Sequence, residues 1–142
     1  MSAHKHLSEE SGYSLVEVLA SIIIMGIAIL PMIAMFDTGL NSATAGSNYD
    51  KARMLANVNV EKVRALPYSD ARDAYPPGAA VPCDESMLSA SEQNLFVCEI
   101  ETTYVNSDLA PNPSSITSMM MVVTVEWGTS GANYSTTGLI TR

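Results

Sequence analysis

Residues 15–36 form an apolar run, LVEVLASIIIMGIAILPMIAMF, in which Glu17 is the only ionisable side chain. As a helix, about 20 apolar residues cross the hydrocarbon core of a bilayer. The run is longer than the apolar region of about 7–15 residues in an ordinary signal peptide, and its end lacks the small-residue pattern of a cleavage site. In a soluble protein, a helix apolar on every face needs partners on all sides, and the rest of a 142-residue chain is too short to supply them. The run therefore predicts a membrane-spanning segment.

Glu17 is the unusual residue of this run. An acidic side chain costs about 2.5–3.5 kcal/mol at the centre of a membrane helix and less near its edge. A plain single-pass anchor, which tolerates Glu17 near the membrane surface, is therefore one interpretation. It accounts for the length of the run but gives Glu17 no role.

Gly12 stands just before the run, and the sequence from there reads G-Y-S-L-V-E. A glycine, four residues, a glutamate and then an uninterrupted apolar helix resemble the class III signal of type IV pilins and secretion pseudopilins. The resemblance implies that a dedicated peptidase cuts between Gly12 and Tyr13 and that Tyr13 is then N-methylated. Glu17 becomes the glutamate at the fifth mature position. This chain departs from the family in beginning with Tyr13, where Phe or Met is more usual.

Physical chemistry gives Glu17 a role that agrees with this resemblance. Cleavage creates an α-amine whose reference pKa of about 7.7–8.0 keeps it largely charged. Side-by-side packing of such helices would bury that amine, and an unpaired buried charge costs several kcal/mol. A carboxylate four residues along the chain can pair with the amine of a neighbouring helix, or with the amine of its own helix, because the two groups lie on the same helix face. We therefore expect Glu17 to set the stagger between subunits during assembly.

The helix changes character beyond the apolar run. Pro31 removes one helical hydrogen bond and is expected to kink or locally melt the helix. Further on, the helical period predicts an amphipathic helix with one apolar face. Asn59 is the polar exception on that face, and Pro67 ends the helix. The apolar members of that face are Ala52, Leu55, Ala56, Val60, Val63 and Leu66.

The remaining sequence predicts a loop followed by strands. Residues 69–94 are rich in Pro, Gly, Ser and Asp, which is typical of a loop. Alternating apolar residues in 95–104 and 119–127 predict strands, and the turn sequence GTSGAN leads to a third strand at 134–142. The predicted fold class is α+β: a long N-terminal helix, apolar in its first half and amphipathic in its second, packed on a small antiparallel sheet. This order of elements is similar to that of the pilin family.

These patterns divide the chain into three parts. Residues 1–12 are the expected leader peptide, residues 13–38 the transmembrane or filament-core half-helix, and residues 39–142 a pilin-like globular domain. Cys83 falls in the predicted loop and Cys98 on the neighbouring strand. In an exported domain a disulfide between them is expected, although a buried free thiol at Cys98 also fits its position on an apolar face.

The composition argues against several classes of function. The two histidines, His4 and His6, lie in the expected leader, so the mature chain would lack the usual general base and zinc ligand. The pairs Asp70/Asp73, Asp84/Glu85 and Glu99/Glu101 are interpreted as solvated charge. We therefore expect no enzymatic activity, no cofactor and no metal site. The net charge of -8 disfavours direct binding of nucleic acid.

The resemblance implies a structural role. The chain would be a minor pilin, held in the inner membrane as a single-pass protein and assembled through its apolar helix into a type IV pilus, or fimbrium. The implied partners are other pilin subunits, the prepilin peptidase and methylase, the inner-membrane assembly platform with its ATPase, and membrane lipids. Two alternatives stay open: a type II secretion pseudopilin of a periplasmic pseudopilus, and a plain membrane-anchored binding domain.

Overall fold

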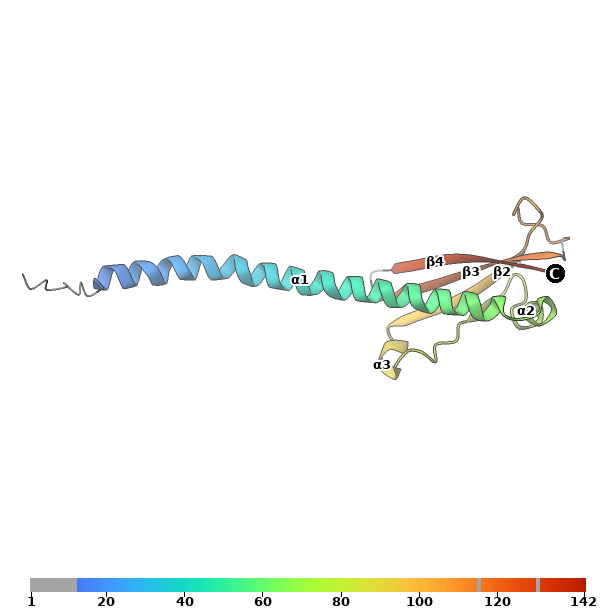
Figure 1. Cartoon of the computed structure of the whole chain (residues 1–142), viewed down its shortest axis with the longest axis horizontal. Coiled ribbons are helices and arrows are strands. Elements are labelled where there is room, and N and C mark those ends of the chain that lie inside the picture. The colour runs from blue at the N-terminus through green and yellow to red at the C-terminus, as the bar shows by residue number, and fades with distance from the viewer. Residues whose placement is uncertain (1–12, 115, 130) are drawn as a thin grey trace, which may run out of the picture. The chain divides into compact units, whose positions relative to one another are not determined.

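The structure, a computed structural model, describes residues 13–114, 116–129 and 131–142. The chain forms two compact units, the first ending at Ala43 and the second spanning Thr44–Arg142. The elements in chain order are α1 (Leu15–Arg64), α2 (Tyr68–Ala74), β1 (Ala80–Pro82), α3 (Ala90–Gln93), β2 (Phe96–Tyr104), β3 (Ser118–Trp127) and β4 (Ala132–Thr141). Figure 1 labels all of them except β1. Helix α1 contributes to both units.

A four-stranded antiparallel sheet forms the body of the second unit. Its strand order is β1-β2-β3-β4, so each strand pairs with its neighbour in sequence. The period-two pattern of β3 places Met119, Met121, Val123 and Val125 on the buried face. The end of α1 packs on this face, which confirms the predicted α+β class.

The amphipathic part of α1 supplies the helical half of this core. Its buried residues are Ala52, Leu55, Ala56, Asn59, Val60 and Val63. The prediction that Leu66 belongs to this face was wrong, because α1 ends at Arg64 and Leu66 is exposed. The physical reason is Pro67, whose ring drives the preceding residue out of the helical region.

Gly138 lets the helix approach the sheet closely. A Cβ at this position of β4 would lie 2.6 Å from Met121 Cε and 3.2 Å from Val60 Cγ1. The Met121 methyl group ends a flexible side chain and can turn aside, whereas Val60 is a stiff β-branched residue of α1. The absence of a side chain at Gly138 therefore lets α1 lie close to β4 at Val60.

Pro31 does not interrupt α1. The helix continues through it from Leu15 to Arg64. Of the two expected effects of Pro31, a kink or local melting, local melting was therefore wrong. Proline removes one backbone hydrogen bond, and the turns on either side keep theirs.

The predicted loop at residues 69–94 contains more structure than expected. Helices α2 and α3 and strand β1 lie within or across it, so the sheet has a fourth strand. Helix α3 begins with a capping box, in which Ser89 and Glu92 satisfy each other's backbone N–H groups. Strand β1 is only three residues long and ends at Pro82, which suits an edge strand. The three predicted strands are confirmed as β2, β3 and β4.

Candidate functional site: the apolar half of α1 and the disulfide-bonded loop

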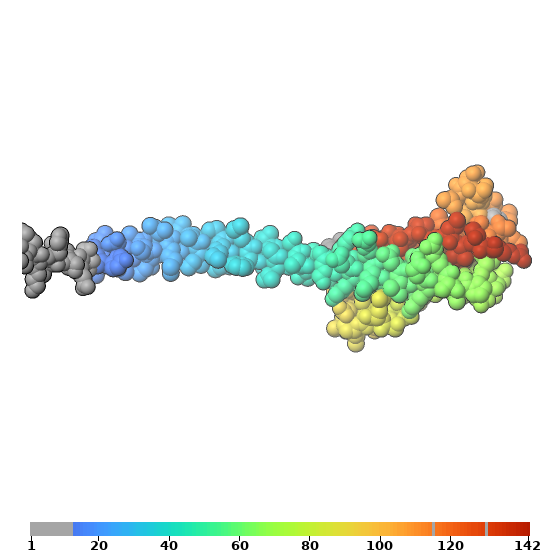
Figure 2. All heavy atoms as spheres, in the orientation of Figure 1, coloured from blue at the N-terminus to red at the C-terminus, as the bar shows by residue number. Residues whose placement is uncertain are grey.

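The first half of α1 presents its side chains outward on all sides. Every residue from 13 to 47 is exposed, and Figure 2 shows the first unit as a single helix with no second layer of its own. The large apolar side chains among them include Ile22, Ile23, Ile24, Ile27 and Leu30, each more than half exposed. Such a surface requires burial in lipid or against other apolar helices.

This half of α1 is long and apolar enough to cross a membrane. At 1.5 Å per residue, residues 15–36 extend about 33 Å, close to the thickness of a bilayer's hydrocarbon core. No other helix in the described ranges passes the same test of length and hydropathy. The segment can therefore serve as a membrane anchor or as a signal.

The hydroxyl groups of Ser21 and Thr38 are satisfied by the helix itself. Ser21 Oγ donates a hydrogen bond to the Glu17 carbonyl oxygen at 2.8 Å, and Thr38 Oγ1 donates to the Ala34 carbonyl oxygen at 2.9 Å. Hydroxyl groups bonded back to the preceding turn do not need water. Ser21 and Thr38 are thus compatible with an apolar environment.

The Glu17 carboxylate differs from these hydroxyls. It lies in the first turn of α1 and makes no hydrogen bond or ion pair with any residue that the structure describes. The helix dipole favours a carboxylate at that end. Tyr13, four residues earlier, is 85% exposed. Gly12, the other half of the expected cleavage site, lies outside the described residues.

The two cysteines form a disulfide at the edge of the sheet. The pairing of β1 with β2 brings Pro82 opposite Glu99, so Cys83 comes opposite Cys98. Their Cα atoms are 5.3 Å apart, and the Cys83 N–H donates to the Cys98 carbonyl oxygen at 3.1 Å. The expected disulfide is confirmed, and the alternative of a free thiol at Cys98 is wrong.

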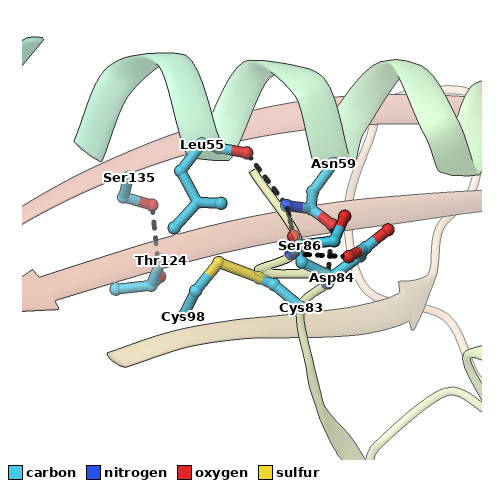
Figure 3. The surroundings of a disulfide bond; sticks show 8 residues. All are labelled: Leu55, Asn59, Cys83, Asp84, Ser86, Cys98, Thr124 and Ser135. Atoms are coloured by element: carbon cyan, nitrogen blue, oxygen red, sulfur yellow. Dashed lines mark hydrogen bonds between the residues drawn. A yellow bond between two sulfur atoms is a disulfide. The ribbon is translucent and has the colours of Figure 1, made fainter. Parts of the chain in front are cut away.

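Asn59 joins the segment after Cys83 to α1 (Figure 3). Its Nδ2 donates to the carbonyl oxygens of Leu55 and Asp84, at 3.0 and 3.1 Å, and its Oδ1 accepts from the Asp84 N–H at 3.0 Å. Asn59 is only 1% exposed. Asn59, the polar residue on the apolar helix face, therefore has a structural role, since it supplies hydrogen-bond partners for the N–H and the carbonyl oxygen of Asp84.

Two ion pairs hold the same segment to α1. Lys62 pairs with Asp84, and Lys51 pairs with Glu92. Hydrogen bonds from Lys62, and then from Ser86, hold the pKa of the Asp84 carboxyl well below its ordinary value. Hydrogen bonds from Lys51, and then from Ser89, lower the pKa of Glu92 to about 2.

The chain matches no family model, and no curated protein and no solved structure matches it. Within the described residues, no three His, Cys, Asp or Glu side chains gather in a way that could hold a metal ion.

Sequence reasoning found the cysteine pair but missed the contacts that surround it. The clearest missed signal is the Ser89-Ala-Ser-Glu92 pattern, which is a capping box. Asn59 stands out in the sequence as a polar residue on an apolar helix face, but the sequence does not indicate that Asp84 is its partner. The partners of Lys51 and Lys62 lie 41 and 22 residues away in sequence, and local periodicity does not reach that far.

Proposed function

We propose that this chain is a structural subunit of a type IV pilus-like filament, of the minor pilin kind. It is held in the inner membrane after cleavage behind Gly12 and N-methylation of Tyr13, and it then enters the filament through the apolar half of α1. The observation that carries this proposal is the exposed apolar run of residues 15–36 with one unpaired carboxylate, Glu17, in its first turn.

The exposed side chains supply the driving force for both states of the subunit. Full burial of one Val, Leu, Ile, Phe or Met side chain is worth about 1.5–3 kcal/mol. Lipid chains satisfy these side chains while the subunit waits in the membrane. The helices of neighbouring subunits satisfy them in the filament, so transfer between the two environments exchanges one apolar contact for another.

Glu17 supplies the specificity that apolar contact lacks. The charged amine of mature Tyr13 needs a counter-charge once it leaves water, and the Glu17 carboxylate is the only acidic group in residues 13–36. Pairing between subunits favours one axial stagger over the others. The remainder of the chain, with its disulfide and sheet, then faces outward and makes specific contacts.

Replacement of Glu17 separates this proposal from a plain membrane anchor. Glu17→Gln keeps the size of the side chain and removes its charge. The variant is expected to be cleaved and retained in the membrane but to be lost from sheared filaments. The matched control is Asp50→Asn, which removes an exposed carboxylate of the same helix outside the apolar run. Normal assembly of Glu17→Gln would favour the plain anchor and contradict the proposal.

A further inference from the structure

A surface hollow of about 380 Å³ lies in the second unit, beside α2 and the end of β4. Its lining residues are Tyr68, Ser69, Arg72, Ile116 and Arg142. In Figure 2 the C-terminal residues (red) meet the region of α2 (green) at one end of this unit. Two arginines from distant parts of the sequence, Arg72 and Arg142, therefore line one hollow.

Hydrogen bonds between the lining segments fix the walls of the hollow. The Tyr68 hydroxyl donates to the Ile116 carbonyl oxygen at 2.7 Å, which ties α2 to the segment before β3. The Arg142 N–H donates to the Thr117 carbonyl oxygen at 2.9 Å. These two hydrogen bonds hold the backbone that carries Arg72 and the backbone of Arg142 against neighbouring segments.

The charges at the hollow are only partly balanced. The ion pairs between described residues are Lys51–Glu92, Lys62–Asp84, Arg64–Glu61 and Arg72–Asp73. Arg142 has no Asp or Glu side chain at ion-pair distance among the residues that the structure describes. Arg72 contacts one oxygen of Asp73, through Nε at 2.9 Å and Nη2 at 2.8 Å. This pair is exposed, and Asp73 does not line the hollow, so a ligand anion can compete for Arg72.

We propose that this hollow binds the oxyanion group of a small organic ligand, a phosphate or a carboxylate. Guanidinium groups hold such oxyanions through paired charge-assisted hydrogen bonds. The volume lies within the range of small-molecule sites, about 300–1,000 Å³. Tyr68 and Ile116 also line the hollow, and their apolar atoms are available to the organic part of the ligand. The site does not depend on the proposed filament function.

Binding is tested on the full chain in detergent micelles by calorimetry, with phenyl phosphate, benzoate and inorganic phosphate as probes. At least one of the two aromatic anions is expected to bind saturably to one site and more tightly than inorganic phosphate. The tighter of the two identifies the oxyanion. Arg72→Gln and Arg142→Gln are each expected to weaken binding about tenfold, the effect of losing one charge-assisted hydrogen bond. Asp73→Asn is expected to strengthen binding, because it removes the competing carboxylate.

Arg53→Gln is the matched control, since Arg53 is an exposed arginine of α1 that has no ion pair within the described part of the chain and does not line the hollow. It should leave binding unchanged. An unaltered fluorescence spectrum of Trp127, the single tryptophan, verifies that each variant is folded. The proposal is overturned if neither aromatic anion binds saturably, or if Arg53→Gln weakens binding as much as Arg142→Gln does.

Discussion

Asn59 and Asp84 exchange two hydrogen bonds: the amide of Asn59 donates to the Asp84 carbonyl oxygen and accepts from the Asp84 N–H. The pair connects a buried position of α1 with the residue that follows Cys83. Together with the disulfide, it fixes a segment that contributes little apolar surface to the core. A polar side chain at the centre of an apolar helix face thus stabilises the loop that lies over it.

Replacing Asn59 by Leu should destabilise the second unit by about 1–3 kcal/mol, because the Asp84 backbone groups lose their partner in a partly buried place. Thermal unfolding of the full chain in detergent, followed by Trp127 fluorescence, measures the change. Asn57→Leu is the control at an exposed position of the same helix and should have little effect. Equal stability of the two variants would contradict the role assigned to Asn59.

The residues explain how far the sequence alone could predict this structure. The period of α1 and the alternation of β2, β3 and β4 are local patterns, and they predicted the helix and three strands. Strand β1 is too short to show a period, and it forms because Val81 pairs with Ile100 across the chain. At Leu66 the local pattern predicted too much. The apolar residues keep the helical period as far as Leu66, but the helix itself ends at Arg64 because Pro67 follows. The contacts of Asn59 depend on the tertiary fold, so its polarity could be noticed but its partner could not be named.

Loss of the disulfide should lower the free energy of unfolding by about 3 kcal/mol, the chain-entropy value for a loop of this length. Cys83 and Cys98 are 15 positions apart in sequence. Unfolding of the oxidised protein is compared with unfolding after reduction. The double variant Cys83→Ala/Cys98→Ala serves as control, because a reductant should not change its stability. If reduction left the native protein equally stable, the disulfide would have no stabilising role.

Gly138→Ala should destabilise the second unit by about 1 kcal/mol, the low end for adding a methyl group to a packed core, because the flexible Met121 side chain can turn aside and only Val60 resists. The new Cβ would meet Met121 Cε and Val60 Cγ1 at distances of 2.6 and 3.2 Å. Gly46→Ala, in open space on α1, should have the opposite sign, because alanine is the better helix former. The thermal unfolding midpoints of the two variants are compared with that of the native protein. An unchanged midpoint for Gly138→Ala would show that α1 and β4 are less closely packed.

The ion pairs of Asp84 and Glu92 predict an acid-sensitive contribution to stability. The pKa of Glu92 falls from its ordinary value of 4.5 to about 2 in the folded protein, and the pKa of Asp84 is lowered too. The unfolded chain therefore binds protons first as the pH drops. The contribution is fully present above about pH 5, begins to shrink as the pH nears the unfolded pKa of 4.5 and is lost as the pH falls towards 2.

This contribution is isolated by comparing the native protein with the double variant Asp84→Asn/Glu92→Gln. The difference in unfolding midpoint should be constant from pH 7 to about 5 and should shrink below that range. Because both pairs are partly exposed, added salt should also reduce it. A difference that stayed constant down to pH 2 would mean that these carboxylates do not stabilise the loop.

Mass spectrometry of the mature N-terminus tests the central proposal most directly. The protein is purified from membranes and from sheared filaments, and its N-terminal peptide is sequenced. The filament proposal predicts a chain that begins at Tyr13 and carries one methyl group on its α-amine, with Glu17 as its fifth residue. A chain that keeps residues 1–12, or that begins at another residue, would contradict it.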